Sequence, residues 1–412
     1  VLAAAARGVG VPAEALPEPT SETLRAGRRH TSGKECLPLA VTLGSLLERV
    51  ERPGSERDRF TFFMPSADGP CRFGAYKELH QVVLDRLGHS GRVRIWSPPF
   101  SNYFQGVPPG FGALVLTGLV ASDLLRDLHG DVRPLETHPG ASDALLARAN
   151  AELVARVERE VKGELALRRV LVETASGRLW GIPQLLRQTA RDFARLRGAR
   201  DLPRVQVTGE IYVRNDPFCT GDLVGALHRR GLRARVVPMT EYLYYSFFLG
   251  GARRGVAHAL EGWVRNRILA ACDAAAAGPM GWTPAPRVAE TVRAGSGYLR
   301  DALRGEAVLT LGTALHAWRH GEIDAVISTG PLECMPNKLA EAQLHHAAEE
   351  EGLLSLTLNL NGEPPDPQLL DAFAFEVHAR HREQRGRAPA SGRDPARALL
   401  PSLGRDPQGS PT

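Results

Sequence analysis

Short apolar runs alternate with helical periodicities in the sequence, and this alternation limits the fold more than any other feature. Residues 59–64 (RFTFFM) and 92–97 (RVRIWS) are strand-like runs, and each is followed by proline. Between them, residues 76–87 repeat apolar side chains at helical spacing. A strand, a helix and a second strand in this order are typical of a parallel sheet covered by helices. The early part of the chain is therefore predicted to be α/β.

The same alternation returns in the last third of the chain. The strand-like runs there are residues 204–213, 233–238, 323–328 and 353–358. The helical patterns between them are residues 222–230, 256–277 and 338–351. We expect an α/β fold with two Rossmann-like, doubly wound parallel-sheet domains, in which ligands bind at the carboxyl ends of the strands. The loops that contain Cys219 and Cys334 fall at such ends.

These patterns divide the chain into four segments. Residues 1–110 are the expected N-terminal α/β domain, residues 111–202 a mainly helical segment, and residues 203–380 the C-terminal α/β domain. Residues 381–412 are rich in Pro, Gly, Arg and Ser and lack apolar periodicity, so we expect a disordered tail. Because the chain begins with valine and not with methionine, we expect the first domain to be truncated at its start.

The composition excludes several classes of protein. Hydrophobic residues make up 43% and charged residues 24% of the 412 residues, as in ordinary globular domains. The formal charge is +5, but the arginines are interspersed with acids and no basic run carries aromatic residues, so we expect no nucleic-acid partner. The longest apolar stretch, residues 111–120, is shorter than the ~20 residues that a membrane-spanning helix needs. We therefore expect no membrane segment and, in the absence of a secretory signal, a cytoplasmic protein.

The five cysteines are the residues best suited to carry chemistry. Their odd number and wide separation argue against a disulfide framework and leave metal binding, catalysis or burial. Cys36 and Cys334 each stand in a Glu-Cys-apolar-Pro sequence where a loop leads into a helix, and Cys71 precedes another helix within GPCRFG. Backbone N–H groups at a helix N-terminus stabilise a thiolate, which is the form that binds metals. We therefore interpret these three cysteines as metal ligands.

The other two cysteines have less distinctive surroundings, and free cysteine is among the most buried residue types. Cys272 lies in an alanine-rich helical run, which predicts simple burial. Cys219 follows a strand and precedes a helix but lacks the Glu-Cys-apolar-Pro sequence. It is therefore either a further metal ligand or a buried side chain.

Charged residues beside the cysteines are further candidates for a site. Glu35 and Glu333 directly precede Cys36 and Cys334, and they are either catalytic bases and hydrogen-bond acceptors at the metal or solvated glutamates. Lysine is rare here, with four residues in the whole chain. The lysines near the cysteines therefore either serve a specific role at the site or stand there by chance. The candidate cofactor-binding residues are Lys34, Arg72 and Lys338.

Four motifs in this sequence resemble a known family. They are SGKECLP (32–38), FFMPSADGPCRFGAY (62–76), GEIYVRNDPF (209–218) and GPLECMP (330–336). Together they look like the 2-hydroxyacyl-CoA dehydratase and benzoyl-CoA reductase subunit family, and most closely its relatives among CoA-substrate-specific enzyme activase-related proteins. The resemblance covers most of residues 25–375, with the motifs in the family's order.

The resemblance implies a two-domain α/β protein with a 4Fe-4S cluster in the cleft between the domains. Cys36, Cys71 and Cys334 match the family's cluster ligands, whereas Cys219 stands where relatives often carry a polar residue. In that family an ATP-hydrolysing activator, separate or fused upstream, delivers a low-potential electron. The dehydratase then passes the electron to an acyl-CoA substrate in anaerobic metabolism. The resemblance is compatible with a homodimer or a heterodimer.

Three readings of the function follow. The first is an iron-sulfur lyase or reductase component of the 2-hydroxyacyl-CoA dehydratase type, favoured because three cysteines leave one iron of a four-iron cluster open to substrate. The second is a non-catalytic iron-sulfur domain for electron transfer or assembly inside a larger activase-related protein. The third is a metal-free α/β binding domain with buried cysteines.

Overall fold

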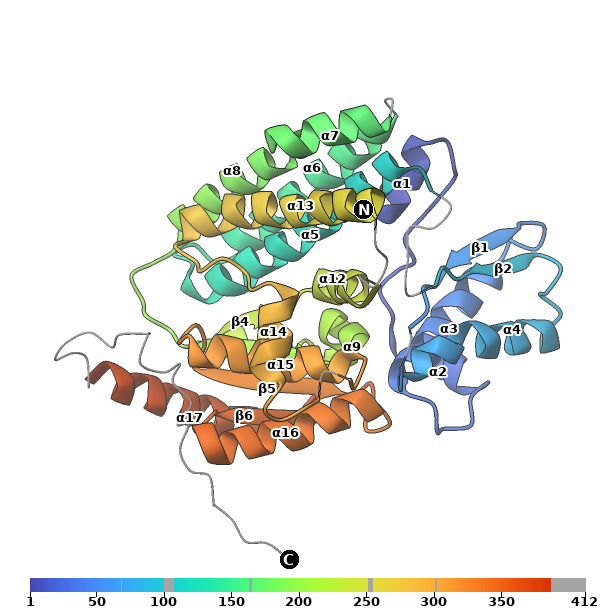
Figure 1. The fold of residues 1–412 in the computed structure, drawn as a ribbon. Coiled ribbons are helices and arrows are strands. Elements are labelled where there is room, and N and C mark those ends of the chain that lie inside the picture. Colours follow the sequence, from blue (N-terminus) through green and yellow to red (C-terminus); the bar gives the residue numbers. More distant parts are fainter. Residues whose placement is uncertain (68, 100–106, 163–164, 251–254, 301, 387–412) are drawn as a thin grey trace, which may run out of the picture.

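The computed structural model describes residues 1–386 apart from 68, 100–106, 163–164, 251–254 and 301. The protein is a mixture of helices and two parallel sheets, in three parts (Figure 1). A bundle of helices lies above a four-stranded sheet, and a small unit with two strands lies beside both. Among the described residues, the helices are too short or too polar to cross a membrane.

The larger sheet is entirely parallel, with strand order β4-β3-β5-β6. Its strands are β3 (Arg204–Gly209), β4 (Arg233–Val236), β5 (Ala325–Gly330) and β6 (Ser355–Asn359). Every residue of β5 is buried, because helices cover both faces of the sheet as parallel sheets require. Gly209 pairs with Thr329, so the carboxyl ends of β3 and β5 lie next to each other.

Helices pack on the two faces of this sheet through separate apolar cores. The helices on one face are α2 (Ser21–Arg28), α3 (Leu37–Val50), α11 (Leu223–Arg229) and α17 (Pro367–Gly386). The helices on the other face are α15 (Glu306–Arg319) and α16 (Met335–Glu351). Ile327 of β5 lies in the first core and Val326 in the second, which is the alternation expected along a strand.

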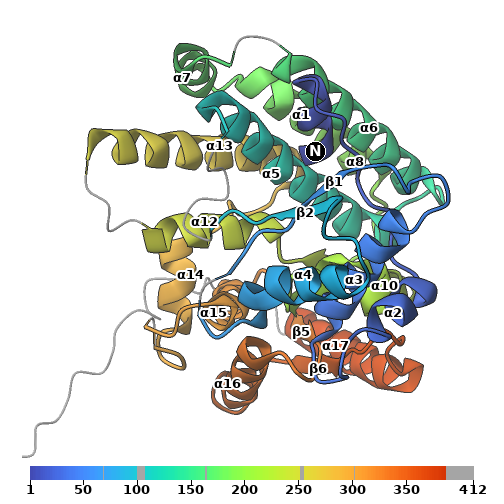
Figure 2. The same cartoon turned by 90° about the vertical axis from the view of Figure 1, so that its right-hand side faces the viewer.

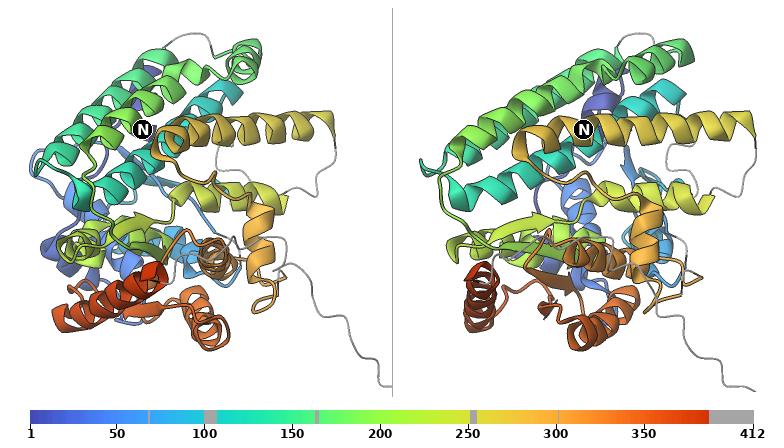
Figure 3. Two further views of the ribbon diagram at one scale, coloured as in Figure 1. Left: turned by 90° about the vertical axis from the view of Figure 1, so that its left-hand side faces the viewer. Right: turned by 60° about the vertical axis from the view of Figure 1, so that its left-hand side comes forward.

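The helical bundle forms a layer of its own above the sheet (Figure 3). Its helices are α1 (Leu2–Gly8), α5 (Pro109–Val132), α6 (Ala141–Val161), α7 (Leu167–Ser176), α8 (Ile182–Leu196) and α13 (Val256–Met280). The helix α5 also packs on the edge strand β4, where the buried Asp131 Oδ1 lies 2.6 Å from Arg233 Nη2. The bundle is thereby joined to the sheet through α5.

The small unit consists of two parallel strands and their helices (Figure 2). Its elements are β1 (Phe60–Phe63), the 3₁₀ turn η1 (Arg72–Ala75), α4 (Tyr76–Arg86) and β2 (Val93–Trp96), together with α3. The helix α3 serves two cores, because Val41 packs on the large sheet whereas Leu43 and Leu47 pack in the small unit. Short helices complete the fold: α9 (Ile211–Asn215), α10 (Pro217–Thr220), α12 (Met239–Leu249) and α14 (Val288–Gly295).

The structure confirms the expected strands and helices in both α/β regions and corrects three details. The run 204–213 is not one strand, because β3 ends at Gly209 and the Glu210 carboxylate caps α9 by accepting hydrogen bonds from backbone N–H groups. The helices α1 and α13 belong to the bundle and not to the α/β parts around them. The expected tail begins as helix, since α17 continues to Gly386, and residues 387–412 lie outside the described residues.

Candidate functional site

Three cysteines interact electrostatically with Glu210, the residue that follows the carboxyl end of β3. Cys36, Cys71 and Cys334 are the residues that immediately precede α3, η1 and α16, so each stands at a helix N-terminus. All three are free thiols, and Cys36 and Cys334 are buried. Their common neighbour is Glu210, whose charge acts on all three thiols, while Cys71 also interacts electrostatically with each of the other two. The three cysteines that the sequence predicted as a set therefore share Glu210 as a neighbour.

Two glycines allow Glu210 to occupy this position. Gly209 has a φ of +108°, and a Cβ there would lie 2.0 Å from the carbonyl oxygen of Thr329. A Cβ on Gly330 would lie 2.4 Å from the Asn337 side-chain amide and 3.3 Å from Glu210 Cβ. The Glu210 backbone N–H donates to the Thr329 carbonyl at 2.7 Å, which fixes the turn. Side chains at either glycine position would displace the loop that lies between the thiols.

The thiols are held in a neutral form by their surroundings. Burial raises the pKa of Cys36 and of Cys334, and it raises the pKa of Cys71 to about 12. The negative charge of Glu210 adds to this effect at each thiol. A buried thiol of this kind becomes a thiolate when a metal compensates its charge.

Tyr76 joins the thiol site, although the sequence analysis did not single it out. Its hydroxyl oxygen lies 2.7 Å from Cys36 Sγ, and the side chain is buried at the start of α4. Burial, followed by the charges of Cys36 and Glu210, holds the pKa of Tyr76 well above its ordinary value, so the hydroxyl keeps its proton. The signal was present in the sequence, since Tyr76 closes the FGAY run that follows Cys71.

A buried arginine and its acidic neighbours form a second group, which interacts electrostatically with Cys71 and Cys334 through Glu306. Arg214 Nη1 donates to Glu306 Oε1 at 2.8 Å, and its Nε donates to the Val237 carbonyl at 3.0 Å. Burial raises the pKa of Glu306 to about 8 although Arg214 opposes the change. The charges of Glu210 and Glu241 also raise the pKa of Glu306, so several acids compete for one guanidinium. Glu306 therefore holds a proton at neutral pH.

The two predicted catalytic acids occupy different surroundings. Glu35 turns back on its own loop, where it accepts hydrogen bonds from the Ser32 N–H at 2.9 Å and the Lys34 N–H at 3.1 Å. Burial opposes these hydrogen bonds but does not outweigh them, and the pKa of Glu35 lies below its ordinary value. Glu333 is half-buried, and within the described part of the chain its Oε2 has no hydrogen-bond partner. Of the two acids, Glu333 is the one whose carboxylate has an oxygen that can still accept a hydrogen bond.

The predicted cofactor-binding residues contact protein groups. Arg72 is exposed and donates a hydrogen bond to the backbone carbonyl of Lys34, which ties the Cys71 loop to the Cys36 loop. Lys338 lies one turn into α16 and donates to Glu341 Oε2 at 2.6 Å and to the Asn359 side chain. The side chain of Lys338 therefore tethers α16 to the end of β6.

The remaining cysteines lie in apolar cores. Cys219 is fully buried in α10 among the side chains that cover the large sheet, and its backbone N–H donates to Asp216 Oδ1 at 2.8 Å. Its thiol interacts with Asp216 and Glu210. Cys272 is fully buried on α13 in the core of the bundle.

The donor set at Cys36, Cys71 and Cys334 suits iron-sulfur chemistry. Thiolate sulfur is the donor that such clusters take, and each thiol adjoins the free N–H groups of a helix start. In the described ranges, no group of three His, Cys, Asp or Glu residues is close enough to hold a metal ion.

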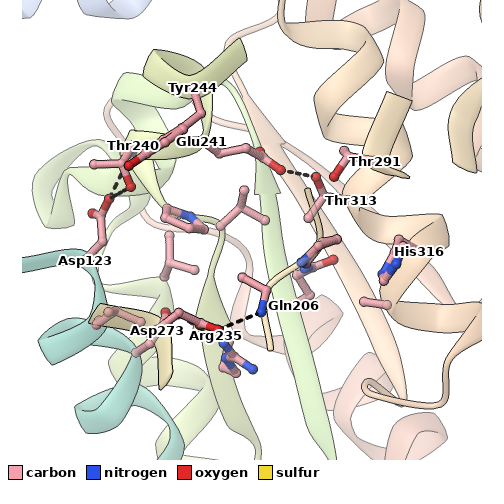
Figure 4. A pocket seen from close by; sticks show the side chains of 18 of the residues that line it. Asp123, Gln206, Arg235, Thr240, Glu241, Tyr244, Asp273, Thr291, Thr313 and His316 are labelled. Atoms are coloured by element: carbon pink, nitrogen blue, oxygen red, sulfur yellow. Dashed lines mark hydrogen bonds and ion pairs between the residues drawn. The ribbon is translucent and has the colours of Figure 1, made fainter. Parts of the chain in front are cut away.

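A separate cavity of about 140 Å³ lies between the large sheet and the bundle (Figure 4). Its walls come from β3, β4, α5, α12, α13, α14 and α15. None of the cysteines lines it, but Glu241, which interacts electrostatically with Glu306, stands in its wall. The Glu241 carboxylate accepts a hydrogen bond from the Thr313 hydroxyl there (Figure 4).

Comparison with known proteins adds no relative: no protein-family model matches the chain, and no curated protein matches it. The resemblance carried by the four sequence motifs therefore stays a prediction, and the site's own chemistry must support any function.

Proposed function

We propose that the protein is the iron-sulfur module of an ATP-dependent reductase system similar to 2-hydroxyacyl-CoA dehydratase. In this proposal it accepts a low-potential electron from an ATP-hydrolysing activator and passes it to an acyl-CoA substrate. The observation that supports the proposal is that three thiols at helix N-termini share Glu210 as a neighbour. We further propose that the two α/β parts are Rossmann-like, doubly wound domains, and that the protein works in the reducing cytoplasm, where unpaired thiols persist.

Cys36, Cys71 and Cys334 would hold a 4Fe-4S cluster. When bound, the cluster supplies one-electron chemistry and an open coordination position. The protein supplies a dry site, because Cys36, Cys334 and Tyr76 are buried. The Tyr76 hydroxyl, 2.7 Å from Cys36 Sγ, would donate to that sulfur and draw charge from it.

Proton supply is the second task of the site in a dehydration. A hydroxyl group that leaves a substrate must take up a proton to depart as water. Glu306 holds such a proton at neutral pH, since its pKa is raised to about 8, and it interacts electrostatically with Cys71 and Cys334. We propose Glu306 as the acid, with Arg214 at 2.8 Å stabilising the carboxylate that remains.

One observation favours electron transfer without catalysis as the second candidate. Leu332 and Met335 flank Cys334 and are 66% and 51% exposed. Apolar side chains at this position would let a partner approach the buried thiol closely, as an electron relay requires. Turnover of an acyl-CoA thioester in the presence of an activator separates the two functions, because a relay reduces its partner and leaves the thioester unchanged.

The experiment that tests the cluster is anaerobic purification followed by iron and sulfide quantification and an absorbance spectrum. We expect about four irons per chain in the wild type. A variant with Cys36→Ser, Cys71→Ser and Cys334→Ser should lose iron and colour. The matched control, Cys272→Ser, changes a thiol in the bundle core and should keep both. A wild type that stays colourless after reconstitution with iron and sulfide would refute the proposal.

A further inference from the structure

The cavity in Figure 4 is a second site, independent of the thiols. It lies against the face of the large sheet, between β4 and the helices α5, α12 and α13, and its volume of about 140 Å³ accommodates more than a single water molecule. No residue of the thiol group lines it. Its chemistry can therefore be considered on its own.

Carboxylates outnumber cations in the cavity wall. Acids reach it from several elements: Asp123, Asp127, Glu241, Asp273 and Glu322. The strongly basic group in the wall is Arg235, which already donates to Asp127 Oδ2 at 3.2 Å and lies 4.5 Å from the ring centre of Trp282. His316 is the other basic side chain in the wall. The wall therefore carries an excess of negative charge and of hydrogen-bond acceptors.

Several of these acceptors lack a donor. Asp123 is satisfied, because its Oδ2 accepts from the Thr240 N–H at 2.9 Å and from the Thr240 hydroxyl at 2.8 Å. In contrast, Asp127 Oδ1, Glu241 Oε2 and Glu322 Oε1 are buried and have no hydrogen-bond partner within the described residues. Asp127 is only 5% exposed. Buried acceptors of this kind require a donor from outside the chain.

The unpaired carboxylates are also short of positive charge. Burial raises the pKa of Glu241 to about 7 and raises that of Asp127 and Asp273. A cation placed among them would supply both the missing charge and the missing N–H donors. An ammonium group carries a full positive charge and three N–H donors.

The rest of the wall is apolar, which selects the body of the ligand. Apolar side chains from the sheet and helices face the cavity: Val120, Leu124, Val236, Leu269, Val288 and Ile323. An inorganic ion would leave this surface without contacts. We propose that the cavity binds a small organic ammonium ion, a primary amine on a short hydrocarbon body, whose ammonium group lies between Glu241 and Asp127.

Calorimetric titration of the full chain with butylammonium chloride tests this proposal. We expect saturable binding of butylammonium and at least tenfold weaker binding of butanol, which has a similar body but no charge. Ammonium chloride should also bind more weakly, because it lacks the hydrocarbon. Equal binding of butylammonium and butanol, no binding of butylammonium, or tighter binding of ammonium chloride would overturn the proposal.

Substitutions place the binding in this cavity. Glu241→Gln preserves the shape of the side chain and should weaken butylammonium binding by about tenfold, the effect of losing one charge-assisted hydrogen bond. Asp127→Asn tests the second carboxylate, on a different helix, in case the first variant folds poorly. The control, Glu349→Gln, removes a charge from an exposed position on α16 and should bind as the wild type does. Unchanged affinity in both cavity variants would overturn the proposal.

Discussion

Replacement of Arg214 is the most informative test of the buried acids behind the thiols. The side chain is 4% exposed, and its guanidinium donates to Glu306 and to the carbonyls of Val237 and Pro238. Arg214→Met removes the charge and these donors but retains much of the apolar volume. Removing one partner of a buried ion pair costs about 3–5 kcal/mol, because the other partner stays buried without compensation. This is a large share of the ~5–15 kcal/mol that stabilises a typical domain.

Urea unfolding at pH 9, above the pKa of about 8 at which Glu306 becomes a carboxylate, measures this loss, because urea does not screen charges. The matched control is Arg229→Met, which breaks a pair with Asp222 at 3.2 Å in which both side chains are more than half exposed. We expect the control to cost no more than about 1 kcal/mol. In the double variant Arg214→Met/Glu306→Gln, part of the stability should return, since the unpaired carboxylate is gone. Equal losses for Arg214→Met and Arg229→Met would refute the reasoning.

The other predictions concern pH, a strand end and a thiol. The pKa of Glu306 rises from 4.5 to about 8 on folding, so the folded state binds an extra proton and the free energy of unfolding should fall as pH rises through this range. In urea titrations at several pH values, Glu306→Gln should flatten the dependence of this free energy on pH. An unchanged dependence would contradict the assignment. Gly209→Ala places a side chain at a φ of +108° and should lower the free energy of unfolding by about 1–3 kcal/mol from backbone strain alone. The control Gly91→Ala places its methyl group in open space and should change stability little. Equal midpoints of thermal unfolding for the two variants would argue against a strained turn. Tyr76→Phe removes the hydrogen bond that lowers the pKa of Cys36, so a smaller fraction of this thiol is ionised. Cys36 of the metal-free variant should therefore react more slowly with iodoacetamide than Cys36 of the metal-free wild type. Equal rates would exclude the hydrogen bond.

The sequence predicted the strands well because they are short apolar runs with sharp boundaries. It predicted the three helix-starting cysteines for a similar reason, since glycine and proline mark the loops around them. The pattern did not predict that β3 ends before Glu210, because the strand-like run continues past the end of β3. The carboxylate of Glu210 caps α9, and this role depends on a backbone turn that the pattern does not show. Periodicity shows that a segment is helical but not what it packs on, which is why the bundle gained α1 and α13.

The acids around Arg214 could not be found in the sequence. Glu306, Glu241 and Arg214 lie on three different helices, and the sequence pattern predicted none of these helices. Their raised pKa values come from burial, which depends on the packing of α9, α12 and α15 against one another. The cavity could not be found in the sequence either, because its unpaired acceptors, Asp127, Glu241 and Glu322, come from segments far apart in the chain.

The position of α3 between two cores has a consequence for dissecting the protein. One face of α3 buries Val41 against the large sheet, and another buries Leu43 and Leu47 against β1 and α4. Neither core is complete without this helix, so the small unit and the sheet should melt in one transition. We expect that an expression boundary placed after Val50 would leave both fragments insoluble, because each core would lose part of its packing. Cys36, at the start of α3, therefore keeps its surroundings only when both cores are present in one chain.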